Sequence, residues 1–319
     1  MSSKPRVVFF GTGSVAAASL EALIESFEIE FVITKARKHR RDPAPVEELA
    51  IKHNLPLKFA SDRAELDDLI ATTEITSRAG VIVDYGVIVS QHTIDKFPLG
   101  IINSHFSLLP EWRGADPITF AILSGQKTTG VSLMLIEPTL DTGQLLAQEE
   151  LGIAQNETTP SLTDKLINLS NRMLNQYIPL YLDGEITPRD QIHPENATYS
   201  RKLVKADGYL DHATMTAIEC ERKIRAFIDW PKTRLAKSCL SFSGLTGESR
   251  ENRMDSPDKL ANDSDGLIIT RAKVLPDFAG DDWPDVVKCA DNTFLQILEV
   301  INPKSGRKMK TADYLRGLK

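Results

Sequence analysis

Residues 6 to 153 alternate short apolar runs with amphipathic stretches, and this alternation restricts the possible folds more than any other feature of the chain. The apolar runs have the length of buried strands, and the amphipathic stretches have the length of helices. Strands that alternate with helices form parallel sheets with helices on their faces. We therefore predict an α/β domain with a mostly parallel sheet in this part of the chain.

The individual elements are predicted from apolar runs and from residues that suit a helix start. The predicted strands are Val7 to Phe10, Glu30 to Thr34, Leu57 to Ala60, Gly80 to Asp84, Gly100 to Asn103, Val131 to Ile136 and Leu145 to Ile153. The predicted helices begin near Ser14, Pro45, Asp62, Asp116 and Ser161, each close to a Ser, Asp or Pro.

The second part of the chain has a different pattern. Residues Thr187 to Lys205 are polar, with little apolar periodicity, and are predicted to connect two domains. A helical pattern over Ala213 to Phe227 is followed by short strand candidates, and the polar segment Phe242 to Leu267 is predicted to be a surface loop. We predict a first domain over residues 1–189, a linker over 190–206, and a smaller β-rich domain over 207–319.

Bulk properties exclude several classes of protein. The chain has no apolar run long enough for a membrane helix and no secretion signal at its start, so we expect a cytoplasmic protein without membrane contact. Its three cysteines, Cys220, Cys239 and Cys289, lie far apart, which argues against zinc or disulfides. The net charge of −6 means that any contact with nucleic acid must use local basic patches.

A glycine-rich turn follows the first predicted strand. Gly11 to Ala16 read Gly-Thr-Gly-Ser-Val-Ala, in the position of a dinucleotide-binding turn. The second strand lacks the carboxylate that binds NAD ribose and is followed by cations that could suit NADP. Two interpretations of this motif stay open. It could bind the cofactor of an NADP-dependent oxidoreductase, or its glycines could only permit a tight turn between strand and helix.

Three polar residues of the first domain form a candidate catalytic set. Asn103 and His105 stand two residues apart at the end of a predicted strand, and therefore on one face of it. Asp141 lies in a turn between two strand candidates. An amide, an imidazole and a carboxylate could together catalyse acyl transfer to an amine without a metal. Each residue alone is more often a cap, a turn or a surface residue.

The order of motifs around these residues resembles the 10-formyltetrahydrofolate-dependent formyltransferase superfamily. The matching strings are Asn103-x-His105, Ser107-Leu108-Leu109-Pro110, Arg113-Gly114-Ala115-x-Pro117-Ile118 and Leu140-Asp141-Thr142-Gly143. The resemblance implies that Asn103, His105 and Asp141 form the transfer site and that Ser107, Leu108, Leu109 and Pro110 contact the folate. It also implies a Rossmann-like catalytic domain with 10-formyltetrahydrofolate as co-substrate and no metal.

Within that superfamily the chain looks most like the methionyl-tRNA formyltransferase family. The further matches include Pro45 to Ala50, Asp84 to Ile88, Thr198 to Leu203, Ile224 to Pro231 and Gly306 to Lys310. They imply an OB-like second domain and formyl transfer to methionine on the initiator tRNA, for translation initiation; they imply no obligate protein partner. The segment carrying Lys35, Arg37, Lys38, Arg40 and Arg41 stands where the family has a basic loop that reaches the tRNA acceptor end.

The chain departs from this family in places, and other functions stay open. Its basic segment is shorter, Asp116 replaces the usual Ala, and Val89-Ser90 replaces the usual Leu-Pro. A sugar-nucleotide N-formyltransferase would share the three catalytic residues but would not need the basic segment. An NADP-dependent oxidoreductase would use the turn at Gly11. A catalytically silent RNA-binding protein would leave Asn103, His105 and Asp141 unexplained.

Overall fold

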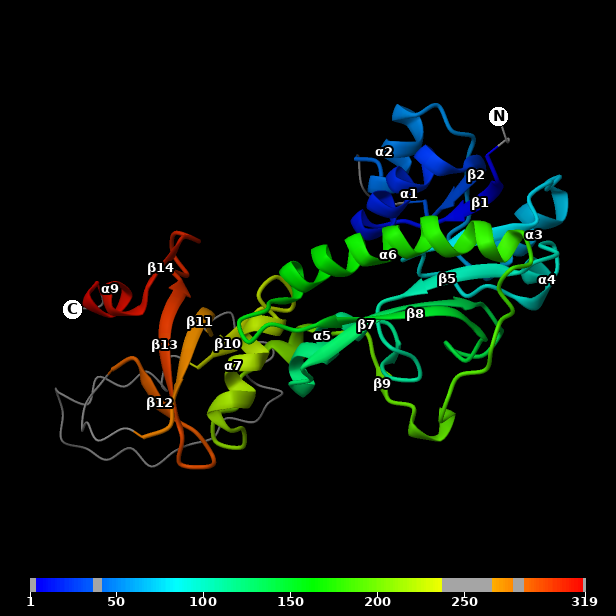
Figure 1. The fold of residues 1–319 in the computed structure, drawn as a ribbon. Coiled ribbons are helices and arrows are strands. Elements are labelled where there is room, and N and C mark those ends of the chain that lie inside the picture. Colours follow the sequence, from blue (N-terminus) through cyan, green and yellow to red (C-terminus); the bar gives the residue numbers. More distant parts are fainter. Residues whose placement is uncertain (1–3, 37–41, 237–265, 278–283, 318–319) are drawn as a thin grey trace. The chain divides into compact units, whose positions relative to one another are not determined.

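The computed structural model describes residues 4–36, 42–236, 266–277 and 284–317 (Figure 1). The chain divides into two compact units. The first consists of residues 1–117, 128–152 and 163–200, and the second of residues 118–127, 153–162 and 201–319. Among the described residues, none of the helices is long and apolar enough to cross a membrane.

The first unit is built on a seven-stranded sheet with the order β3-β2-β1-β4-β5-β7-β8. Its strands are β1 (Arg6–Phe10), β2 (Glu28–Thr34), β3 (Leu57–Phe59), β4 (Ala79–Ile82), β5 (Ile101–His105), β7 (Thr128–Leu135) and β8 (Leu145–Gly152). Its helices are α1 (Ser14–Ser26), α2 (Pro45–Lys52), α3 (Arg63–Thr72), α4 (Gln91–Ile94) and most of α6 (Thr159–Leu182). Helix α5 (Pro117–Ser124) precedes β7 in the chain, but its residues from Ile118 onward belong to the second unit.

The direction of the strands changes beyond β5. Strands β1 to β5 pair in parallel, whereas β7 runs antiparallel to β5, and β8 runs antiparallel to β7. The order of the parallel strands reverses between β1 and β4, which is the position where doubly wound sheets usually bind their ligands. The sheet is therefore mostly parallel, with two antiparallel strands at one edge.

Apolar side chains alternate between the two faces of the sheet because successive strand residues point to opposite sides. On one face, Phe10 and Ile101 pack with Leu66 and Ile70 of α3 in one buried cluster. Helix α6 covers the other face, where Ser104 of β5 and Ser170 of α6 are hydrogen-bonded at 2.7 Å. Both faces are covered, as a parallel sheet requires.

A short two-stranded pairing lies beside this sheet. Strand β6 (Arg113–Gly114) pairs in parallel with β9 (Tyr199–Ser200). The segment that the sequence predicts as a linker therefore contributes a strand to the first unit, and a 3-10 turn, η1 (Pro194–Asn196), precedes it. The domain boundaries at residues 189 and 207 stay a prediction.

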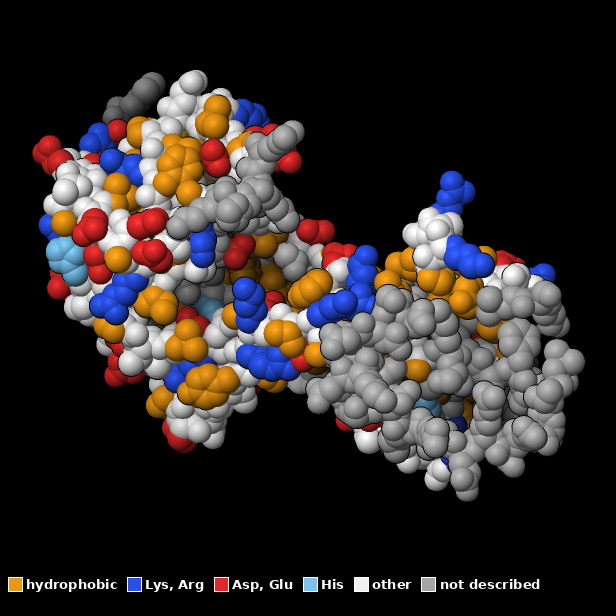
Figure 2. Space-filling model, turned by 180° about the vertical axis from the view of Figure 1, so that it is seen from behind, with side chains coloured by type: hydrophobic (Ala, Val, Ile, Leu, Met, Phe, Trp, Pro, Cys, Tyr) orange, Lys and Arg blue, Asp and Glu red, His pale blue; other side chains and the backbone are white. Residues whose placement is uncertain are grey.

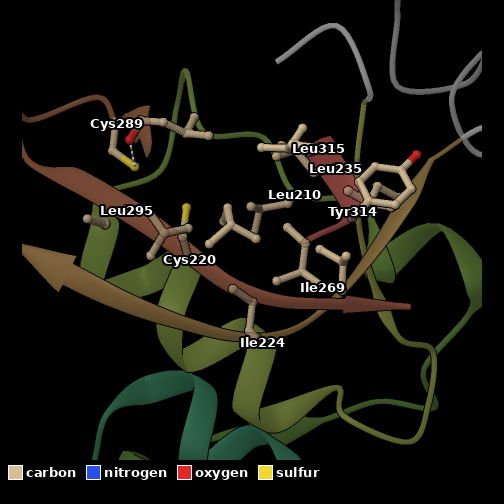
Figure 3. Packing of buried hydrophobic residues seen from close by; sticks show 14 residues of the cluster. Leu210, Cys220, Ile224, Leu235, Ile269, Cys289, Leu295, Tyr314 and Leu315 are labelled. Atoms are coloured by element: carbon tan, nitrogen blue, oxygen red, sulfur yellow. Dashed lines mark hydrogen bonds between the residues drawn. The ribbon is translucent and has the colours of Figure 1, made fainter. Parts of the chain in front are cut away.

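The second unit contains a five-stranded antiparallel sheet. Its strands are β10 (Thr233–Leu235), β11 (Leu267–Leu275), β12 (Val286–Lys288), β13 (Phe294–Ile301) and β14 (Lys308–Lys310), and its other elements include η2 (Lys205–Gly208), α7 (Ala217–Ala226) and α9 (Thr311–Arg316). Figure 3 shows its core, in which Tyr314 and Leu315 of α9 lie near Leu235 and Ile269 of the sheet, and Cys220 of α7 lies near Leu295.

The fold-class prediction is confirmed: a mostly parallel sheet with helices is followed by a β-rich unit. Cys220 and Cys289 are buried in the core of the second unit as free thiols. Cys239 lies outside the described residues, as does the predicted surface loop up to residue 265. The predicted helix starts agree with those of α1, α2, α3, α5 and α6 to within two residues.

We expect the core of the first unit to depend strongly on Ile70, which is fully buried in α3. The Ile70→Ala substitution should lower the free energy of unfolding by about 2–5 kcal/mol, because it removes buried methyl groups and leaves a cavity. Ile51→Ala in α2 is a matched control, since Ile51 is 60% exposed and its truncation should cost less than about 0.5 kcal/mol. Urea denaturation of both variants tests this, and equal losses would contradict the packing described.

Candidate functional site

Strand β5 presents Asn103 and His105 on one face of the sheet. The strand lies between β4 and β7, and Asn103 stands opposite Ile82 on one side and Met134 on the other. Ser104 points to the opposite face, toward α6. The Asn103 side chain is half-buried, and within the described residues its amide has no hydrogen-bond partner. It is therefore available to a substrate.

The imidazole of His105 is buried and faces an oxygen at each of its nitrogens. Its Nε2 lies 3.0 Å from the backbone carbonyl oxygen of Trp112. Its Nδ1 lies 3.9 Å from Oδ2 of Asp141, which is ion-pair distance but longer than a hydrogen bond. The structure thus brings His105 and Asp141 together, as the sequence predicts.

Asp141 is held in an uncommon backbone conformation. Its φ of 50° lies in the left-handed region, which Asp adopts more readily than most residues with a β-carbon. Its Oδ2 accepts a hydrogen bond of 2.7 Å from the backbone N–H of Gly114, and its carbonyl accepts one of 2.8 Å from the Gln191 side chain. The carboxylate that faces His105 is therefore fixed from two other segments of the chain.

The Ser107 to Pro110 loop is tied to β7 and β8. Ser132 Oγ donates to the Ser107 carbonyl and accepts from the Leu109 N–H, and the Gln148 amide donates to the Leu109 carbonyl. Ser107 and Leu109 are buried, whereas Leu108 and Pro110 are half-buried. The backbone groups of Ser107 and Leu109 thus hold the loop in place, and the side chains of Leu108 and Pro110 retain surface that a ligand can contact.

The glycine-rich turn after β1 packs against the loop after β4. The Thr12 N–H donates to the Asp84 carbonyl at 3.2 Å, and a β-carbon on Gly13 would lie 2.3 Å from Oδ2 of Asp84. A carboxylate thus stands at the start of α1, where a dinucleotide site would receive an anionic pyrophosphate. This packing explains the glycines without a nucleotide and disfavours the oxidoreductase reading.

Asp84 and Asp116 are like charges near the transfer residues. Asp84 follows β4, the strand beside β5, and Asp116 directly precedes α5, two residues after Gly114. Asp84 is exposed as a residue, yet the protein around its carboxyl group, together with the negative charge of Asp116, raises its pKa to about 6. The charge of this part of the site therefore changes close to neutral pH.

The predicted basic segment is only partly described. Lys35 follows β2 and is half-buried, whereas Arg37, Lys38, Arg40 and Arg41 lie outside the described residues. On the face of the first unit that Figure 2 shows, acidic side chains are mixed with basic and apolar ones. The described residues on this visible face form no continuous basic surface. This distribution agrees with the net charge of −6.

The sequence did not single out three groups that the site contains. These are the Gln191 amide, the Arg113 guanidinium that donates to it at 2.6 Å, and the Asp84 carboxyl. Arg113 and Asp84 stand inside motifs that carry the family resemblance, but Gln191 lies in a polar segment without periodicity. Among the described residues, no three His, Cys, Asp or Glu side chains are grouped so as to hold a metal.

Comparisons with known proteins find similar chains. The family model described as formyl transferase matches residues 5–178. A methionyl-tRNA formyltransferase of Myxococcus xanthus is 32% identical over 99% of this chain and 96% of its own, and that of Chloroflexus aurantiacus is 37% identical over 71% and 74%. A solved N-formyltransferase of Helicobacter canadensis, in complex with folinic acid and dTDP-3-aminofucose, covers 92% of this chain and 98% of its own with a TM-score of 0.62 at 17% identity.

We expect the raised pKa of Asp84 to make stability depend on pH. Between its ordinary value of 3.8 and about 6, the folded protein binds more protons at this carboxyl group than the unfolded chain does, so stability falls as pH rises through this window. The Asp84→Asn variant should therefore have a higher Tm than the parent above pH 6 and lose that advantage below pH 4. Thermal melts across this range, with the exposed Asp68→Asn as a surface-charge control, test this; a pH-independent difference would contradict it.

Proposed function

Because this chain belongs to the formyl transferase family and matches methionyl-tRNA formyltransferases over almost its whole length, we propose that it formylates methionine on the initiator tRNA. The formyl donor is 10-formyltetrahydrofolate, and the product serves translation initiation in the cytoplasm. The observation that carries this proposal is the His105 and Asp141 pair, 3.9 Å apart, inside the matched region, with the half-buried Asn103 on the same face of β5.

The proposed reaction needs no covalent enzyme intermediate. The α-amino nitrogen of methionine attacks the formyl carbon, and the carbonyl oxygen becomes an oxyanion. Asn103 and protonated His105 donate hydrogen bonds to this oxyanion, and Asp141 orients the imidazole and assists removal of the amine proton. The bond between the formyl carbon and the folate nitrogen then breaks, and that nitrogen takes up a proton.

The position of His105 adds one requirement to this mechanism. Its Nε2 is engaged with the Trp112 carbonyl, and its Nδ1 faces Asp141. To donate to the oxyanion, the imidazole exchanges the Trp112 carbonyl for the substrate oxygen while Asp141 keeps the other nitrogen in place. Hydrogen bonds of catalytic groups commonly become better aligned only when substrate is bound.

The Ser107 to Pro110 loop fits the proposed donor. A folate has a flat heterocycle, which suits apolar surface next to the reacting groups. Leu108 and Pro110 provide such surface, and the buried contacts of Ser107 and Leu109 to Ser132 hold the backbone of the loop still. A rigid loop loses little conformational entropy when the donor binds.

The choice of acceptor depends on features outside the transfer site, since the three catalytic residues do not select it. Two features favour tRNA over an amino sugar nucleotide. The Myxococcus xanthus relative that matches nearly the whole chain is a methionyl-tRNA formyltransferase at 32% identity, whereas the N-formyltransferase solved with dTDP-3-aminofucose shares 17% identity. The segment from Lys35 to Arg41 has five cations in an otherwise acidic chain, and such a segment suits an RNA backbone.

A direct assay separates the two acceptors. The protein is incubated with 10-formyltetrahydrofolate and either methionyl initiator tRNA or an amino sugar nucleotide, and the products are weighed by mass spectrometry. We expect the mass of the aminoacyl-tRNA to rise by one formyl group and the mass of the sugar nucleotide to stay the same. Formylation of the sugar nucleotide in place of the tRNA would overturn it.

We expect His105→Ala and Asn103→Ala each to lower kcat by about 10²–10³, because each removes a hydrogen bond to the oxyanion. His92→Ala is the matched control, since His92 is exposed on α4 and should leave kcat unchanged. Single-turnover formylation and thermal melts of each variant separate loss of chemistry from loss of folding. Near-normal rates in both catalytic variants would refute the assigned roles.

Neutralising Lys35, Arg37, Lys38, Arg40 and Arg41 together should raise KM for the tRNA and make its salt dependence shallower. Every side chain that pairs with a phosphate should, on neutralisation, reduce the slope of log affinity against log salt by roughly one. Hydrolysis of the formyl donor without tRNA serves as the control and should change little. An unchanged tRNA affinity and salt slope would mean that the segment is only a solvated surface.

A further inference from the structure

Gln191 closes the turn that carries Asp141. The side chain is buried, and its Nε2 donates to the Asp141 carbonyl at 2.8 Å and to the Gly143 carbonyl at 3.1 Å. Its Oε1 accepts from the Arg113 guanidinium at 2.6 Å. One amide thus links both ends of the Asp-Thr-Gly turn to the Arg113 segment.

The neighbours of this amide fix which way it points. Backbone carbonyls only accept hydrogen bonds, and a guanidinium only donates them. The nitrogen of the Gln191 amide must therefore face the two carbonyls, and the oxygen must face Arg113. A Glu side chain in this place would put a carboxylate oxygen against the two backbone carbonyl oxygens, which also only accept hydrogen bonds. A Leu side chain would remove the hydrogen bonds to both carbonyls and to the Arg113 guanidinium.

The turn needs such a contact because Asp141 is in the left-handed region, which is unfavourable for a residue with a β-carbon. The Gly114 N–H holds the carboxylate of Asp141, and Gln191 holds its carbonyl. Gly114 makes the first of these contacts itself, and the adjacent residue Arg113 orients Gln191, which makes the second. The backbone and the side chain of Asp141 are therefore set by one short strand, β6.

Arg113 itself is an unusual residue to bury. It is 6% exposed, and among the described residues its guanidinium makes no ion pair and its Nε has no hydrogen-bond partner. A buried charge without a carboxylate costs stability. The hydrogen bond to Gln191 offsets part of that cost and ties the guanidinium to the turn of Asp141.

We propose that Gln191, oriented by Arg113, is a positioning residue that holds the turn in which the Asp141 carboxylate faces His105. The inference rests on the proposed formyl transfer, since it assigns Gln191 an effect on that reaction through Asp141. Gln191 acts through Asp141 and not through contact with the reacting atoms, so it should affect turnover rather than the binding of either substrate.

The test compares kcat and KM for formylation in Gln191→Leu and Gln191→Glu. Misplacing a catalytic group by about 1 Å can cost up to about 10²-fold in rate, so we expect kcat to fall by roughly ten- to a hundredfold with KM for both substrates nearly unchanged. Gln144→Leu is the matched control, because the Gln144 amide bonds the neighbouring Asp190 carboxylate and should leave kcat unchanged. If Gln191→Leu does not fold, Gln191→Glu, which keeps the shape of the side chain, carries the comparison. Parental kcat in a folded Gln191 variant would overturn the proposal.

A double substitution distinguishes positioning from a general loss of structure. If Gln191 acts through Asp141, adding Gln191→Leu to Asp141→Asn should lower kcat little beyond the Asp141→Asn value. Losses that multiply would overturn the proposal. If the parent protein does not formylate the tRNA, the proposed function is wrong. If the parent is active, Asp141→Asn has a low kcat and Gln191→Leu has the parental kcat, only the role proposed for Gln191 is wrong.

Discussion

The antiparallel pairing of β7 with β5 is the constraint on which the candidate site depends. Because β7 runs against β5, its last residue, Leu135, pairs beside Ile102, near the beginning of β5, while His105 stands at the end of that strand. The turn after β7 must therefore reach back along β5 to bring Asp141 to His105. A turn that extends from the sheet in this way needs support along its length, and the Gly114 N–H and the Gln191 amide supply it.

Much of the first unit could be predicted from the sequence because its signals are local. The apolar run from Val7 to Phe10 and the helix start at Ser14 follow from composition and spacing alone. The shared face of Asn103 and His105 follows from strand geometry. Their combination with Asp141 is a candidate set from the residue types, and the family resemblance implies its role as the transfer site. His105 and Asp141 lie 3.9 Å apart in the structure.

The rest depends on contacts between segments far apart in the chain, which leave no local signal. Gln191 lies in a stretch that composition describes as a connector, yet it is buried and bonded to residues 50 and 78 positions earlier. The pairing of β6 with β9 joins two-residue strands that no periodicity can reveal. The neighbourhood of Asp84 and Asp116 likewise appears only in three dimensions, because it depends on the strand order and not on the distance along the chain.

The contact between Gly13 and Asp84 has a consequence for how this fold is put to use. A doubly wound sheet usually binds its ligand where the strand order reverses, which here is between β1 and β4. In this protein the side chain of Asp84 packs against the glycine turn that would form part of such a ligand site. The proposed transfer residues Asn103 and His105 lie instead on β5, the strand that pairs with β4. The glycine motif of nucleotide-binding enzymes is therefore present here because the strand-to-helix turn packs tightly. By itself the motif indicates the fold of the chain and not its cofactor.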